Sequence, residues 1–127
     1  MLNLQSVVEK FSIISNIEME NCSKWIPICR ESLNDIQIKL KETINLQDAS
    51  ISYRIEAAAA ALSLYKYALY SGANMAMQSF SAGEIQIKSD NAGAVKIAKR
   101  IWQEAKNSIS DLLKDENFAF ERVSFND

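Results

Sequence analysis

Hydrophobic residues in the middle of the chain follow a helical spacing. Between Asp48 and Ser71 they recur every three or four positions, so they lie along one stripe of an α-helix. The stripe consists of Ile51, Ile55, Ala58, Leu62, Tyr65 and Leu69. Asp48 can cap the first turn, Gly72 can end the helix in a left-handed conformation, and the run Ala57 to Ala61 lets neighbouring helices approach closely. The pattern predicts a central core helix over about 48–71.

Two helices are predicted before the central one. Apolar residues at helical spacing indicate the first over about 4–14. Ser15 is followed three residues later by Glu18, a capping box that typically starts a helix. Apolar residues then continue to Leu40, which predicts a second helix over about 16–41.

Pro27 interrupts this second helix. It lacks an N–H and crowds the preceding turn, which costs about 3 kcal/mol inside a helix. Either the helix kinks at Pro27, or Ser23 caps a new helix that has Pro27 in its tolerant first turn. We favour the second arrangement.

The spacing changes from helical to alternating over about 78–88. Ile85 and Ile87 alternate with polar residues there, and Phe80 stands before the turn. Gly83 suits the left-handed position of a bulged type I turn, so the segment predicts a small β-hairpin. Because a lone hairpin is marginal in water, it must lie on the helices or pair with another strand, including one from another subunit.

A last helix and an aromatic arm complete the expected fold. Ser89 or Asp90 can cap a helix over about 90–115. Its apolar stripe is Ala94, Ala98, Ile101, Ala105, Ile109 and Leu112, with Trp102 and Leu113 on the border. Residues 116–127 then form an extended C-terminal arm with unusually many apolar side chains: Phe118, Phe120, Val123 and Phe125. The fold class is therefore mainly α, a single domain over 1–127 with about four bundled helices, the hairpin and the arm.

Composition limits the classes of function. The chain has 127 residues, 14 basic and 16 acidic, so no global field favours nucleic acid or a membrane surface. Neither a signal peptide nor a membrane-spanning run is visible, and we expect a soluble protein made in the cytoplasm. Cys22 and Cys29 would lie about 10 Å apart on one helix, too far for a disulfide, so we expect buried free thiols.

The chain offers little catalytic chemistry. It contains no histidine, which excludes Cys-His pairs and Ser-His-acid triads, and its two cysteines fall short of a zinc site. Its three glycines are spaced too widely for a phosphate-binding loop. Among the carboxylates only Glu56 adjoins an apolar run, and we interpret it as the polar edge of its helix rather than a buried acid. We therefore identify no catalytic, metal-binding or cofactor-binding residue and expect neither enzymatic activity nor a cofactor.

Basic residues concentrate between positions 88 and 106. Five of the fourteen basic residues fall there, opposed only by Asp90 and Glu104. They are Lys88, Lys96, Lys99, Arg100 and Lys106. This basic cluster is either a solvated helix face or a surface for phosphates or an acidic partner.

The tyrosines leave a similar choice between packing and binding. They are Tyr53, Tyr65, Tyr67 and Tyr70, all on the predicted central helix. They could form a stacking platform, but on a core helix their rings are more often packed with the hydroxyls at the rim, and we favour packing.

Three stretches together resemble a known family. They are the alanine-rich helix and tyrosines of Ile55 to Tyr70, the Phe-x-x-Gly-Glu turn in Gln78 to Ile85, and Trp102 to Phe120. Their order resembles small head–tail connector (adaptor, or head-completion) proteins of tailed bacteriophages and prophages of Gram-positive bacteria. The resemblance covers about two thirds of the chain. It implies a helical bundle with a small β element.

The resemblance also implies a role in virion assembly. Such a protein forms a ring matching the dodecameric portal, binds portal and tail or stopper proteins, and links the DNA-filled head to the tail. It is made in the host cytoplasm and belongs to the neck of the virion, with no membrane partner. The expected subunit or partner contacts are Phe80, Ile85, Ile87, Phe118, Phe120, Val123 and Phe125, and the basic cluster would face packaged DNA in the lumen. The alternative is a small helical regulator that binds nucleic acid or protein.

Overall fold

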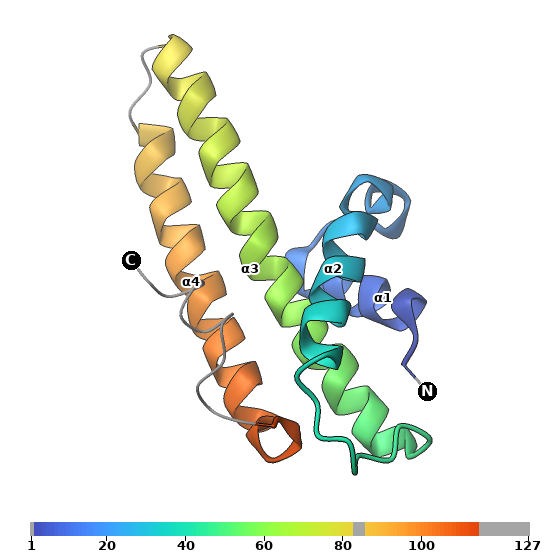
Figure 1. Ribbon diagram of the computed structural model, residues 1–127. Coiled ribbons are helices and arrows are strands. Elements are labelled where there is room, and N and C mark those ends of the chain that lie inside the picture. The colour runs from blue at the N-terminus through green and yellow to red at the C-terminus, as the bar shows by residue number, and fades with distance from the viewer. Residues whose placement is uncertain (1, 83–85, 115–127) are drawn as a thin grey trace.

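The fold is mainly α, as predicted (Figure 1). The computed structural model describes residues 2–82 and 86–114, with the side chains of 2–71 and 93–114. Helices take up 78% of the interpretable residues, and the described part of the chain contains no strand. The elements in order are α1 (Leu4–Ser15), the 3₁₀ turns η1 (Met19–Asn21) and η2 (Ser23–Trp25), α2 (Ile26–Gln37), α3 (Ala49–Ala82), α4 (Gln86–Ser108) and the 3₁₀ turn η3 (Ser110–Leu112).

Helix α3 is the centre of the fold. Helix α4 runs along one side of it, and α1 and α2 pack on the N-terminal half of its other side (Figure 1). Ile55, Leu62, Tyr65 and the alanines Ala58 to Ala61 are all buried. Because these alanines hold no neighbouring backbone away, helices pack against α3 from both sides. The predicted core helix is confirmed in its middle, but Leu69 of the predicted stripe is 44% exposed and the helix does not end at Gly72. Asp48 caps its start by accepting hydrogen bonds from the Ser50 N–H (2.9 Å) and hydroxyl (2.8 Å).

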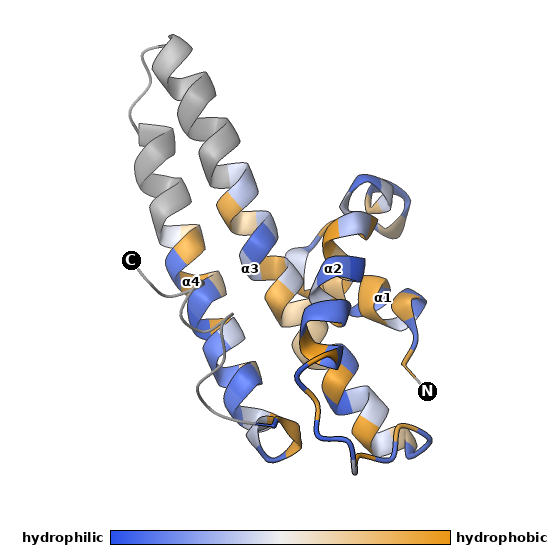
Figure 2. Ribbon diagram, viewed as in Figure 1, coloured by the Kyte–Doolittle hydropathy of each residue, from blue (hydrophilic) through white to orange (hydrophobic). Residues whose placement is uncertain are grey.

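Polar and apolar residues alternate along the described parts of the helices (Figure 2), and the buried apolar residues form one core. On α4 the buried line differs slightly from the predicted stripe. Ala98 and Trp102 are buried, as is Ile109 just after the helix, whereas Ala94 is exposed and Ile101 is half-buried. The line is rotated toward Trp102, which we expected on the border, because the largest apolar side chain gains most from burial.

The predicted β-hairpin is wrong where the structure describes it. Helix α3 continues through Gly72 to Ala82, and α4 begins at Gln86. One glycine inside a helix costs only about 1 kcal/mol, and the packing of α3 against α4 carries the chain past it. Phe80 therefore lies in α3 and Ile87 in α4, while Ile85 lies outside the described residues.

The predicted second helix is also wrong, because the chain breaks between α1 and α2. Ser15 is the last residue of α1 rather than a cap, and Asn16 follows with φ of 61°, a left-handed conformation that asparagine tolerates well. Two 3₁₀ turns then lead to α2, which has Pro27 in its first turn. Our favoured placement of Pro27 is confirmed, although Ser23 belongs to η2 and does not cap the helix.

The end of α4 is joined to the connection between α2 and α3. Helix α4 stops at Ser108, short of the predicted end at 115, and η3 turns the chain back. The Lys41 N–H donates to the Leu112 carbonyl (2.9 Å), and the Lys114 N–H donates to the Lys39 carbonyl (2.8 Å). These bonds flank an antiparallel bridge between Leu40 and Leu113. The predicted arm, 116–127, lies outside the described residues.

Candidate interaction surfaces

Titratable side chains do not gather into a site for metal chemistry. Among the residues with described side chains, no three cysteines, aspartates or glutamates lie together in a way that could hold an ion. Among the described side chains, the buried titratable residues are Glu56, Cys22, Cys29 and Tyr65.

Glu56 is buried and tethers α1 to α3. The residue is only 6% exposed, so our interpretation of Glu56 as a polar helix edge is wrong. One carboxylate oxygen accepts the Asn3 N–H (2.8 Å), and the other lies 3.9 Å from the Lys10 ammonium. Asn3 is the N-cap of α1, and a carboxylate at a helix N-terminus is favourable. Because both oxygens have partners, Glu56 acts as a structural acid.

Cys22 and Cys29 are buried free thiols, as predicted. The assumed geometry was wrong, because Cys22 lies between the two 3₁₀ turns and only Cys29 lies in α2. The Cys22 thiol donates weakly to the Ile17 carbonyl (3.7 Å). Burial raises the pKa of the Cys29 thiol above its usual value of 9.0. Both thiols are therefore inert core groups at neutral pH.

Aromatic rings join η2 and α1 to α3. The Trp25 ring meets Tyr67 edge-on at a centroid distance of 4.7 Å and Tyr70 at 5.6 Å. Phe11 meets Tyr67 at 5.8 Å. Packing is confirmed for Tyr67 and for the buried Tyr65.

The other two tyrosines reach the surface. Tyr53 is 62% exposed and carries the Lys10 ammonium above its ring at 4.4 Å. Tyr70 is 56% exposed although it touches Trp25. The two lie seventeen residues apart on one helix, about 25 Å at 1.5 Å per residue, so they do not form one stacking platform.

Ion pairs fix the helices around α3. The Lys66 ammonium on α3 lies 2.6 Å from a Glu31 oxygen and 2.7 Å from an Asp35 oxygen on α2. On the other side, Arg54 donates to the Asp111 carboxylate (2.7 Å) and the Ser108 carbonyl (2.8 Å). The hydrogen bond from Arg54 lowers the pKa of Asp111 below its usual value. Such exposed pairs add little stability, so they accompany the packing of α2 and η3 on α3 without being its main cause.

The basic cluster lies along one side of α4. All five residues belong to this helix, although the side chain of Lys88 is not described. At 3.6 residues per turn they fall within an arc of about 120°, away from the buried line of Ala98 and Trp102. Lys96 and Arg100 are exposed, and Lys99 and Lys106 are half-buried. The five positions therefore share one side of the helix, which suits either alternative that the sequence left open.

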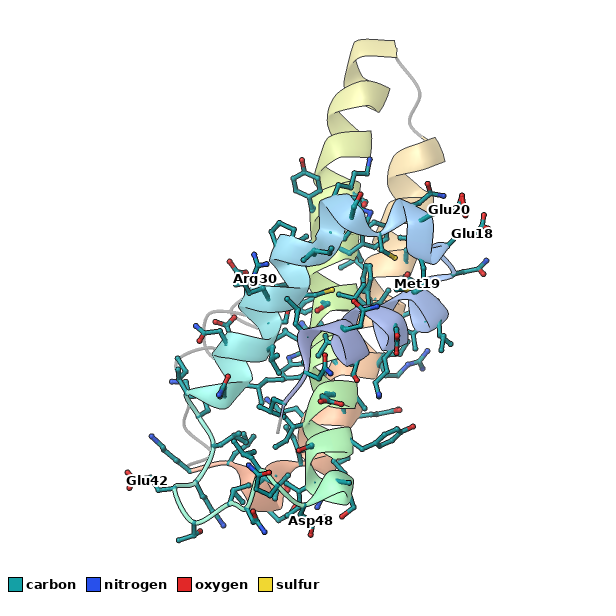
Figure 3. The ribbon with its side chains drawn as sticks, turned by 90° about the vertical axis from the view of Figure 1, so that its right-hand side faces the viewer. Glu18, Met19, Glu20, Arg30, Glu42 and Asp48 are labelled. Carbon is teal, nitrogen blue, oxygen red and sulfur yellow. The ribbon has the colours of Figure 1, made fainter. Side chains whose placement is uncertain are left out.

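Several apolar side chains are exposed at places that the sequence analysis did not single out. At the end of α1 and in η1, Ile13 is 77% exposed, Ile14 43% and Met19 42%. In Figure 3, Glu18, Met19 and Glu20 lie close together at the right of the view, and Glu42 and Asp48 lie at the bottom. Ile13 falls off the 4, 7, 8, 11 spacing of α1, which is the signal that could have identified it, whereas Ile14 follows Phe11 by three residues and keeps to the spacing.

A cavity lies where α2, the connection to α3 and Lys114 meet. Its volume is about 480 Å³. We call it the 37–46 groove, lined by Gln37, Ile38, Leu40, Lys41, Glu42, Ile44, Leu46 and Lys114. Because it joins Lys114 to residues 37–46, which are far away in sequence, no local sequence pattern indicates it.

No family model, curated protein or solved structure matches the chain. Among the described residues, none of the helices has the length and apolar character needed to cross a membrane. Of the predicted contact residues, Phe118, Phe120, Val123 and Phe125 lie outside the described part of the chain.

Proposed function

We propose that this chain is a head–tail connector of a tailed bacteriophage or prophage, a structural protein of the virion neck. It forms a ring on the portal and joins the head to tail or stopper proteins. The sequence resemblance supplies the identity of the assembly, and one feature of the fold supports an assembly role.

That feature is the length of α3 beyond the helices that cover it. Its 34 residues span about 51 Å at 1.5 Å per residue, whereas α1 and α2 have only 12 residues each. In Figure 1 the upper parts of α3 and α4 stand clear of α1 and α2 as a helical pair. A two-helix layer without a further layer on it buries little surface, so such a projection favours packing against another subunit. We expect neighbouring copies to cover it in a ring.

The proposal is tested by mixing the purified chain with the portal protein of the same phage or prophage. Native mass spectrometry should detect a ring of copies on the portal, and mass spectrometry of purified virions should detect the chain. A chain that stays monomeric beside the portal and is missing from virions would overturn the proposal.

The regulator remains the second candidate, because the basic cluster forms one continuous arc on α4. Phosphate contacts from such a surface release counterions, so the affinity for DNA should fall steeply with salt. Lys96→Glu with Arg100→Glu should abolish binding by a regulator and leave portal binding by a connector intact. Lys24→Glu with Arg30→Glu, at exposed positions outside α4, is the control with the same change of net charge.

A further inference from the structure

We propose that the 37–46 groove is the docking site for the chain's own C-terminal arm, with Phe118 and Phe120 as the inserted side chains. Three observations support this intramolecular contact: where the chain leaves the groove, what lines it, and the charge of the arm.

The arm starts at the edge of the groove. Lys114 is the last described residue and is itself part of the groove lining. The Leu40–Leu113 bridge holds this end of the chain antiparallel to residues 39–41. A continuation in the same direction leads past Ile38 and Gln37 toward the end of α2. Phe118 is four residues beyond Lys114 and reaches at most about 14 Å from it, so the groove lies within its range.

The groove offers apolar surface that the described residues leave uncovered. Ile38 is 57% exposed, and Ile44 and Leu46 are half-buried. A volume of about 480 Å³ falls within the range of about 300–1,000 Å³ typical of ligand pockets, so it has room for an aromatic ring. In an extended chain Phe118 and Phe120 project to the same face, which suits insertion from one side.

The charges of the arm and of the groove also favour docking of the arm. Residues 115–127 contain four acidic residues and one arginine, a net charge of −3. The groove carries Lys41 and Lys114 against the single acid Glu42. An acidic arm with aromatic side chains therefore matches an apolar groove with a cationic edge.

The arm is covalently attached next to its own groove, which favours docking there over docking in the groove of a second copy. A short flexible link gives an effective concentration in the millimolar range, above the micromolar concentrations at which proteins are usually studied. Docking within one chain is therefore favoured over exchange between chains. It is a property of the free chain and goes beyond the connector role proposed above.

Cysteine cross-linking tests this contact in the full-length chain. Gln37→Cys lies in the groove on an exposed position, and Ala119→Cys lies between the two phenylalanines. Mild oxidation at micromolar protein should form an intrachain disulfide at a rate independent of concentration. Lys96→Cys with Ala119→Cys is the control, because Lys96 is equally exposed but lies on α4 away from the groove. We expect the groove pair to cross-link several-fold faster, and Phe118→Ala with Phe120→Ala to remove that advantage.

Equal rates for the two pairs, or no loss of the advantage in the double alanine variant, would overturn the docking. A disulfide that forms only between copies and accelerates with concentration would overturn it too. Methyl NMR of the chain without engineered cysteines gives a second measurement. Removing residues 115–127 should shift the signal of Ile38 but leave that of the equally exposed Ile97 unchanged, and an unchanged Ile38 signal contradicts the contact.

Discussion

Leu40 and Leu113 face each other in an antiparallel backbone bridge, although 73 residues separate them in the chain. Both are buried, and hydrogen bonds from Lys41 to Leu112 and from Lys114 to Lys39 flank the bridge. The bridge fixes the end of α4 against the connection that leads into α3. It therefore determines both the closure of the core at this end and the place from which the C-terminal arm leaves.

Overpacking the alanine run should destabilise the fold. Ala59 is 0% exposed, so Ala59→Trp forces a large ring between α3 and its neighbours, which costs about 1–3 kcal/mol or more where the backbone cannot move. A thermal melt checks this, with Ala94→Trp on the exposed side of α4 as the control. An Ala59→Trp melt within a degree or two of the unmodified chain would show that this side of α3 is not core.

The central helix and its core could be predicted from sequence because a run of alanines and a regular apolar spacing both favour the same element. The hairpin could not, because alternation over a few residues, such as Ile85 and Ile87, is also compatible with a helix. Packing between α3 and α4 then decides the conformation. The 37–46 groove depends on the Leu40–Leu113 bridge, a long-range contact that no local pattern encodes.

Removing the buried acid should weaken the attachment of α1. Glu56→Leu removes the charged acceptor of the part-buried Asn3 N–H and the partner of the Lys10 ammonium, and a hydrogen bond to a charged group contributes about 1.5–3 kcal/mol. Glu56→Gln keeps an acceptor for Asn3 and should cost less. Urea unfolding measures both, with Glu9→Leu on the exposed side of α1 as the control. If Glu56→Leu loses no more stability than Glu9→Leu, the tether is unimportant.

The thiols should be protected until the chain unfolds. Cys22 and Cys29 are 1% and 0% exposed, so a thiol reagent should label them only in denaturant. Asn21→Cys adds an exposed thiol next to them and should react at once in the native state, which makes it the control. Rapid native labelling of either natural cysteine contradicts the packing described here.

Cys29 should also make stability depend on alkaline pH. Burial raises its pKa in the folded state above 9.0, so the unfolded chain releases the proton more readily. The stability that the protonated Cys29 thiol contributes is fully present below pH 9.0 and is lost as pH rises through the folded-state pKa. Urea unfolding between pH 7 and pH 10.5 should show a smaller loss of stability in Cys29→Ala than in the unmodified chain. Equal losses would show that Cys29 ionises alike in both states.

Deleting residues 117–127 should separate folding from assembly. The described core closes without these residues, so far-ultraviolet circular dichroism of the truncated chain should keep nearly all its helical signal. Ring formation or attachment to the portal should be lost, because the deletion removes Val123 and Phe125, which we expect to contact a partner. A truncated chain that unfolds, or one that still completes heads in an assembly assay, would remove the arm from the mechanism.

The most direct test of the connector role is native mass spectrometry of the full-length chain incubated with the portal protein of its own phage or prophage. The account predicts a complex of the portal with a ring of copies of this chain, formed at physiological salt. It is contradicted if the chain remains a monomer that does not bind the portal at any concentration tested.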